Sequence, residues 1–172
     1  EKIEFVVTYA CTGRCKHCSE GDHDGCHTAI DADAAASLVT KVAENYNIQS
    51  LMTFGGEPLL YPEVTSQIHR AAADAGIPKR QLITNGFFSR DERRIRQVAQ
   101  ALADAGVNDV LISVDAFHQE HIPLEPVRTF ALDNTSKEIL TPENFALLVT
   151  NYEPEDGALL EKLLRDMIAA ED

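Results

Sequence analysis

Three cysteines near the start of the chain have the spacing of a metal-binding loop. Cys11, Cys15 and Cys18 form the pattern C-x3-C-x2-C, and Cys26 completes a 16-residue window that contains all 4 cysteines of the sequence. A disulfide framework normally distributes its cysteines along a small secreted chain, whereas clustered thiols indicate metal binding or redox chemistry. Because Gly13 permits a tight bend between the first two cysteines, the three sulfur atoms can converge on one small metal centre.

Two kinds of metal centre compete for this loop, and the residues alone leave both open. A structural zinc ion needs four ligands, and His17, His23, Cys26 or His27 could supply the fourth. An iron–sulfur cluster is held by closely spaced cysteine thiolates. Zinc sites usually combine two separated ligand pairs, a spacing that C-x3-C-x2-C does not provide. Three loop thiols without any metal are the third alternative.

The elements that must position these cysteines repeat as a strand followed by a helix. Strands are expected at residues 3–8, 50–54, 81–84 and 109–114, and helices at 32–45, 62–76, 91–105 and, shorter, after 123–126. This alternation predicts βαβ units and a parallel sheet, and therefore the α/β class. The strands are nearly continuous apolar runs, as expected for a sheet covered on both faces.

Each expected strand is followed by a distinctive group of residues. The cysteine loop follows the first strand, Gly55-Gly56-Glu57-Pro58 the second, Thr84-Asn85-Gly86 the third, and Ser113-Val114-Asp115 the fourth. Parallel α/β folds bind their ligands at the edge formed by the carboxyl ends of the strands. We therefore expect the four groups to form one site at that edge.

These motifs together resemble those of the radical S-adenosylmethionine (radical SAM) enzymes. The resemblance rests on Cys11-x3-Cys15-x2-Cys18 and Thr53-Phe-Gly-Gly-Glu-Pro-Leu59, and it covers about residues 3–121. It implies a partial parallel (β/α) barrel with four clear βα units, in a single domain over residues 1–172. Residues 124–172 fit further units poorly, so we expect this part of the barrel to be abbreviated or incomplete.

The resemblance implies two cofactors, a [4Fe–4S] cluster and S-adenosylmethionine. Cys11, Cys15 and Cys18 would hold three irons, and the fourth would chelate the amino and carboxylate groups of S-adenosylmethionine. An electron from a donor such as a ferredoxin or flavodoxin would cleave it to a 5′-deoxyadenosyl radical, which abstracts hydrogen from a small-molecule, peptide or protein substrate. Such an oxygen-sensitive cluster implies an anaerobic setting. The alternative is a non-enzymatic zinc- or iron–sulfur-binding regulatory module on a degenerate barrel.

The Gly-Gly-Glu-Pro motif resembles the family's contact with the methionine end of S-adenosylmethionine. Gly55 and Gly56 would allow close backbone approach, Glu57 would accept a hydrogen bond from the ammonium group, and Pro58 would stiffen the turn. The alternative is an ordinary turn between a strand and a helix, in which this composition is common.

Further cofactor contacts follow from the other motifs. The resemblance places His17 near the adenine, Thr84 and Asn85 among the cofactor contacts, and Ser113 and Asp115 at the ribose hydroxyls. Asparagine before glycine is also a turn signal, and serine or aspartate after a strand can cap the next helix.

Asp115 and His118 are the candidates for a catalytic role. Both belong to the polar stretch after the fourth strand, and a histidine titrates near neutral pH, so it could bind substrate or move a proton. The alternative is that these residues lie on an exposed loop and have no catalytic role.

Composition excludes several other classes of function. The formal net charge is −13 at pH 7, which argues against a nucleic-acid-binding surface. The sequence has no apolar run long enough to span a membrane, and residues 1–9 do not have the composition of a signal peptide. We therefore expect a cytoplasmic protein.

Overall fold

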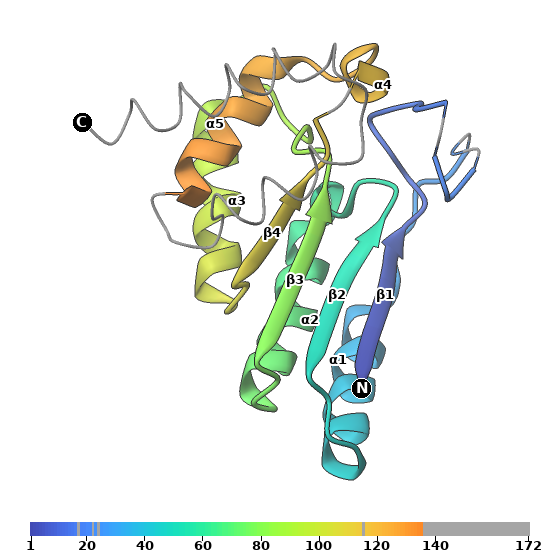
Figure 1. Cartoon of the computed structure of the whole chain (residues 1–172), viewed down its shortest axis with the longest axis vertical. Helices are drawn as coiled ribbons and strands as arrows, with labels where there is room; N and C mark the ends of the chain where they lie inside the picture. Colours follow the sequence, from blue (N-terminus) through green and yellow to red (C-terminus); the bar gives the residue numbers. More distant parts are fainter. Residues whose placement is uncertain (17, 22, 24, 115, 136–172) are drawn as a thin grey trace.

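Helices alternate with strands along the chain in the computed structural model, which describes residues 1–135 except 17, 22, 24 and 115 (Figure 1). The elements are β1 (Lys2–Thr8), α1 (Ala32–Asn45), β2 (Ser50–Gly55), the short 3-10 helix η1 (Pro58–Leu60), α2 (Pro62–Asp74), β3 (Lys79–Thr84), α3 (Glu92–Asp104), β4 (Asp109–Ile112), α4 (Ala116–Gln119) and α5 (Leu124–Thr135). No helix in the described part of the chain is long and apolar enough to cross a membrane.

The strands form one parallel sheet in the order β1-β2-β3-β4, as far as the chain is described. Each strand therefore neighbours the next one in the sequence, and all carboxyl ends meet at the upper edge in Figure 1. Around the sheet, α1 packs on α2, α2 on α3, and α3 on α5. Sequential parallel strands with helices between them are the winding of a (β/α) barrel, and the fold is a partial parallel (β/α) barrel.

Local capping residues explain where the helices begin and end. The Asp31 carboxylate accepts a hydrogen bond from the Ala34 amide at the start of α1, and Asp91 does the same with the Arg93 amide at the start of α3. Pro62 occupies the first turn of α2, where a missing amide proton costs nothing. These helices match the predicted ones to within two residues at either end.

Two groups of buried apolar side chains fill the space between the sheet and its helices. The first joins β1 and β2 to α1 and α2, and the second joins β3 and β4 to α3 and α5; they are centred on Val39, Leu51 and Ile68, and on Leu82, Leu102 and Phe130. Burial of each of these side chains contributes about 1.5–3 kcal/mol. Every strand is thus anchored through a helix, which fixes the relative positions of the carboxyl ends.

The segment after β4 is more regular than its sequence pattern indicated. Residues 116–119, expected to be a loop, form α4, and the helix expected after 123–126 continues to Thr135 as α5. Phe130 on α5 packs edge-on against Phe88, with 5.6 Å between ring centroids, so tertiary packing extends this helix. Most of the part expected to be abbreviated or incomplete, residues 136–172, lies outside the described residues.

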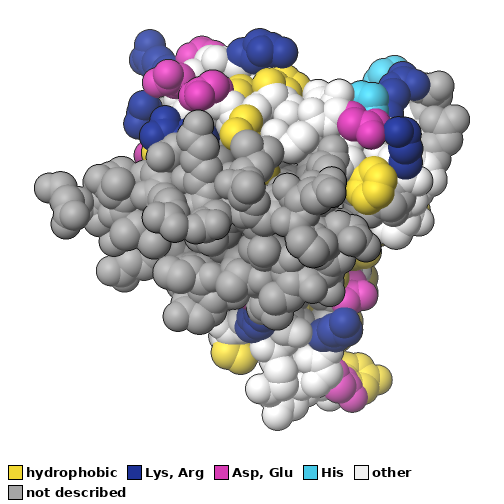
Figure 2. All heavy atoms as spheres, turned by 45° about the horizontal axis from the view of Figure 1, so that its top comes forward, with side chains coloured by type: hydrophobic (Ala, Val, Ile, Leu, Met, Phe, Trp, Pro, Cys, Tyr) yellow, Lys and Arg dark blue, Asp and Glu magenta, His cyan; other side chains and the backbone are white. Residues whose placement is uncertain are grey.

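Charged side chains of opposite sign lie beside one another at the upper edge (Figure 2). The Lys16 ammonium lies 3.0 Å from the Glu120 carboxylate, and the Arg96 guanidinium lies 3.0 Å from the Glu92 carboxylate. Both pairs are exposed, so each contributes at most about 1 kcal/mol to stability. The Lys16–Glu120 pair nevertheless links the cysteine loop to the end of α4.

Candidate functional site

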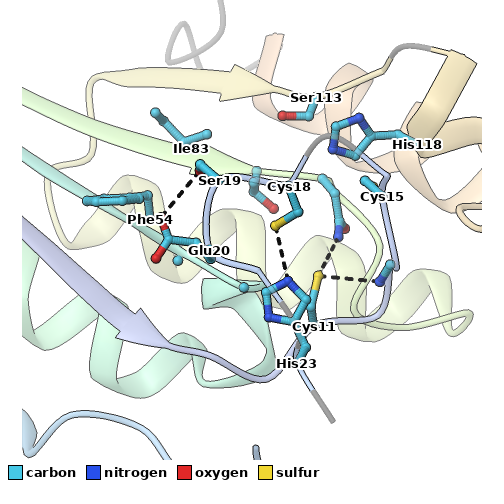
Figure 3. Close-up of a pocket in the computed structure, with 15 residues that line it drawn as sticks. Cys11, Cys15, Cys18, Ser19, Glu20, His23, Phe54, Ile83, Ser113 and His118 are labelled. Carbon is cyan, nitrogen blue, oxygen red and sulfur yellow. Dashed lines mark hydrogen bonds between the residues drawn. The ribbon is translucent and has the colours of Figure 1, made fainter.

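A cavity of about 240 Å³ lies at the carboxyl edge of the sheet (Figure 3). Every strand contributes to its lining, either through its last residues or through the residues that follow it. The predicted site residues that line it are Cys11, Cys15 and Cys18 after β1, Gly55 and Gly56 at β2, Thr84 and Asn85 at β3, Ser113 after β4, and His118 on α4. The structure therefore brings the four predicted groups together at one place.

The loop that carries the cysteines is closed at its base. The Thr8 hydroxyl donates to the carbonyl of Thr28 at 2.7 Å, and the Ile30 amide donates to the carbonyl of Val7 at 2.8 Å. These bonds bring the end of β1 and the segment before α1 together. The intervening residues must therefore project from the sheet edge as a loop, and the cysteines lie on that loop.

Hydrogen bonds hold the thiols of Cys11 and Cys18. All four cysteines are free of disulfides. Cys11 Sγ accepts from the Gly13 amide at 3.3 Å and from the Asn85 side-chain nitrogen at 3.6 Å. Cys18 Sγ lies 3.2 Å from His23 Nε2, and the other ring nitrogen of His23 lies 2.7 Å from the Tyr9 carbonyl. Burial raises the pKa of the Cys11 thiol, and the Gly13 amide opposes that rise.

Three cysteines on one cavity are a donor set that fits an iron–sulfur cluster. Among the described residues, no three histidine, cysteine, aspartate or glutamate side chains are close enough to hold one metal ion. Cys11, Cys15 and Cys18 all line the same cavity. Iron–sulfur clusters are larger than single ions and take thiolate ligands, so these residues fit such a cluster.

Gly55 and Gly56 allow two backbone segments to come unusually close. Gly55 has φ +134°, and a Cβ atom at either glycine would overlap a backbone carbonyl, that of Thr8 or of Ala10 respectively. The Gly56 amide donates to the Thr8 carbonyl at 2.8 Å, and the Glu57 amide donates to the Ala10 carbonyl at 2.7 Å. The motif thus holds the chain that leads directly into Cys11.

Glu57 is fully buried behind the cavity, and neither it nor Pro58 belongs to the lining. Its Oε1 accepts from the Leu59 amide at 2.9 Å and from the Thr84 hydroxyl at 2.7 Å, while Oε2 accepts from the Asn85 amide at 2.8 Å. Burial raises the pKa of this carboxyl to about 7, although the same hydrogen bonds oppose the rise. Glu57 therefore connects η1 to the end of β3.

Other predicted and unpredicted residues complete the site. His17 and Asp115 lie outside the described residues. Sequence reasoning did not include Phe54 and Ile83 in the site, although both line the cavity. Each directly precedes a predicted motif at a strand end, and alternation along the strand would have placed it on the opposite face from its neighbour. Thr12, which bonds to the Phe87 carbonyl at 2.7 Å, lacked any sequence signal.

Two known proteins are similar in sequence to this chain over about two thirds of its length. A "Probable GTP 3',8-cyclase" of Sulfolobus acidocaldarius is 31% identical over 118 residues, which are 66% of this chain and 34% of that protein. A "GTP 3',8-cyclase" of Chlorobaculum tepidum is 28% identical over 118 residues, 69% of this chain and 34% of that protein. The chain thus spans about a third of the length of these relatives.

Solved structures share the fold. The structure of anSMEcpe with bound AdoMet (S-adenosylmethionine) matches with a TM-score of 0.61 and 18% identity, over 81% of this chain and 41% of that one. Its complex with AdoMet and the Kp18Cys peptide matches with a TM-score of 0.57 and 16% identity, over 80% of this chain and 41% of that one. The family model described as "Radical SAM superfamily" matches residues 5–140. The chain therefore belongs to the radical SAM superfamily.

Proposed function

We propose that this chain is the cofactor-binding part of a radical SAM enzyme. In this proposal Cys11, Cys15 and Cys18 hold a [4Fe–4S] cluster, and S-adenosylmethionine binds beside it in the cavity. The observation that carries the proposal is the convergence of three thiols with the ends of all four strands on one cavity. Membership of the family supports both cofactors.

When bound and reduced, these cofactors supply a 5′-deoxyadenosyl radical, which abstracts hydrogen from a substrate. The chain itself positions and shields them. Gly55 and Gly56 present backbone at the cavity wall, Ser113 presents a short polar side chain beside it, and Thr84 lines it while its hydroxyl bonds to Glu57. In this proposal these groups orient S-adenosylmethionine, with His17 at the adenine and Ser113 and Asp115 at the ribose.

Substrate and electron donor complete the proposed reaction. We assign substrate contact or proton transfer to His118, which lines the cavity, and to Asp115. The relatives named GTP 3',8-cyclase make GTP the first substrate to test, within the broader class of small molecules, peptides and proteins. A ferredoxin or flavodoxin supplies the electron. The proposed unit is one domain over residues 1–172, of which 124–172 form the atypical part of the barrel.

Cluster content after anaerobic reconstitution tests the cysteine assignment. We expect about four irons and four sulfides per chain in the wild type, with absorbance near about 400 nm. Cys15→Ala should lose most of this iron, because Cys15 lines the cavity. Cys26→Ala is the matched control and should keep it, since Cys26 does not belong to the lining.

Two results would refute the assignment. One is zinc at about one ion per chain, with no iron or sulfide, after strictly anaerobic purification. The other is equal iron loss in Cys15→Ala and Cys26→Ala, which would mean that the motif does not select the ligands.

A further inference from the structure

Asn85 connects the end of β3 to the cysteine loop. The residue is only 5% exposed, and its side-chain nitrogen makes its contacts with residues more than 70 positions earlier in the chain. The side-chain nitrogen lies 3.1 Å from Thr12 Oγ1 and 3.6 Å from Cys11 Sγ. Asn85 is therefore within hydrogen-bonding reach of a thiol that the proposed function assigns to the cluster.

The hydrogen bonds fix which end of the amide faces the sulfur. Asn85 Oδ1 accepts from the Phe87 amide at 2.8 Å. The amide oxygen therefore faces the backbone of the turn after β3. The Thr12 hydroxyl donates to the Phe87 carbonyl at 2.7 Å, shorter than its 3.4 Å distance to Asn85 Oδ1. Thr12 Oγ1 can then accept from one N–H of Asn85, and the second N–H remains for Cys11.

Neighbouring groups hold this amide in place before any cofactor binds. The Asn85 backbone amide donates to Glu57 Oε2 at 2.8 Å, and Thr84 Oγ1 accepts from the Gly86 amide at 2.9 Å. Cys11 Sγ also accepts from the Gly13 amide at 3.3 Å. Two N–H groups thus point at one sulfur, that of Gly13 from the cysteine loop itself and that of Asn85 from the end of β3.

We propose that Asn85 is a positioning residue whose side-chain N–H donates to the Cys11 thiolate and raises the reduction potential of the cluster. This inference rests on the proposed function, because it requires a cluster on Cys11. Hydrogen bonds to cluster sulfurs stabilise the added negative charge of the reduced state. The effect is larger in a half-buried site, where water screens charge less than at the surface.

An anaerobic potentiometric titration of the reconstituted full chain tests this role, with the electron paramagnetic resonance signal of the reduced cluster as the readout. Asn85→Ala should shift the midpoint potential to more negative values. We expect a change of about tenfold in the reduction equilibrium, which corresponds to about 59 mV for one electron.

Asn108→Ala is the matched control. Its side-chain amide also braces a turn, accepting from the Arg80 amide at 2.8 Å and donating to the Pro78 carbonyl at 2.8 Å, but at the opposite edge of the sheet. This variant should keep the wild-type potential. If Asn85→Ala also keeps the wild-type potential, the inference is wrong while the proposed function stands. A wild-type chain that forms no cluster refutes the proposed function itself.

A second measurement tests the contact between the Asn85 amide and the cluster even if Asn85→Ala binds no cluster. Pulsed electron paramagnetic resonance of wild-type protein labelled with ¹⁵N in its asparagine side chains should show nitrogen coupled to the reduced cluster. Asn85→Asp keeps an acceptor for the Phe87 amide but has no N–H to donate, so this coupling should disappear. Absence of the coupling in the wild type, or its persistence in Asn85→Asp, would overturn the inference.

Discussion

The Glu57 carboxylate accepts three hydrogen bonds in a fully buried position. Its partners are the Leu59 amide, the Thr84 hydroxyl and the Asn85 amide, so one side chain joins the segment after β2 to the end of β3. Because the pKa of Glu57 is raised to about 7, the group is ionised above neutral pH, where buried hydrogen bonds to the charged carboxylate contribute about 1.5–3 kcal/mol each. Glu57 therefore stabilises the wall of the cavity from behind.

Replacement of Glu57 by glutamine tests this stabilising role. Glutamine would turn an NH2 group toward one of the three donors and leave that donor without an acceptor. We expect Glu57→Gln to lower the free energy of unfolding by about 1–3 kcal/mol. Urea denaturation of the cluster-free full chain measures this change.

Glu63→Gln is the matched control, because the Glu63 side chain is 78% exposed and its nearest ion-pair distance, to Arg94, is 3.8 Å. It should change the free energy of unfolding by no more than about 0.5 kcal/mol. Equal stability of the two variants would show that Glu57 has no structural role. The remaining role for Glu57 would then be the one implied by its motif, a hydrogen bond with the ammonium group of S-adenosylmethionine.

The sequence motif identifies Glu57 as a site residue but does not show which groups its carboxylate contacts. The sequence identified the residue, and the resemblance implied a ligand for it, but the carboxylate has three protein donors around it. Those donors come from residues up to 28 positions away, and only the pairing of β2 with β3 brings them together. Thr12 and Asn85 likewise bond across 73 positions, which no local pattern encodes.

At the scale of elements, the end of β2 fixes the start of the cysteine loop. Gly55 and Gly56 allow this segment to pass so close to residues 8–10 that no side chain fits between them. The amides of Gly56 and Glu57 then continue the pairing beyond β1. The position of Cys11 therefore depends on glycine, which has no Cβ atom, at positions 55 and 56 of the neighbouring strand end.

Gly56→Ala should disturb the cysteine loop without touching a cysteine. The added methyl group would overlap the Ala10 carbonyl, so the two segments must separate. We expect a loss of about 2 kcal/mol or more in stability, and at most half of the wild-type iron after reconstitution. Urea denaturation and iron analysis measure the two effects.

Gly76→Ala separates this effect from the general cost of replacing a glycine. Gly76 has φ +72° after α2, but a Cβ atom there would meet no other group within 4 Å. Its cost should be about 1–2 kcal/mol from backbone strain alone, with full iron content. Normal iron content in Gly56→Ala would contradict the positioning role of the glycine pair.

The elements themselves were largely predictable because their signals are local. Asp31, Asp91 and Pro62 mark helix starts, and the apolar runs mark the strands. The exceptions follow β4, where α4 is one turn long and α5 is extended by packing against α3 and Phe88. Neither cause is visible in hydrophobic periodicity.

At the scale of the whole molecule, the described residues form a partial barrel whose open edge carries the site. Four strand ends converge there, and the family match extends over residues 5–140. The net charge of −13 agrees with the proposed small-molecule, peptide or protein substrate more readily than with a nucleic acid. The central claim is that this edge binds a cluster and S-adenosylmethionine together.

The most direct test of that claim is cleavage of S-adenosylmethionine by the reduced, reconstituted chain. After anaerobic incubation with dithionite, the wild type and Cys26→Ala should each produce 5′-deoxyadenosine and methionine in a 1:1 ratio. Cys15→Ala should produce neither. Quantification of both products by liquid chromatography gives the answer. A wild-type chain that carries its full cluster and leaves S-adenosylmethionine intact would contradict the account.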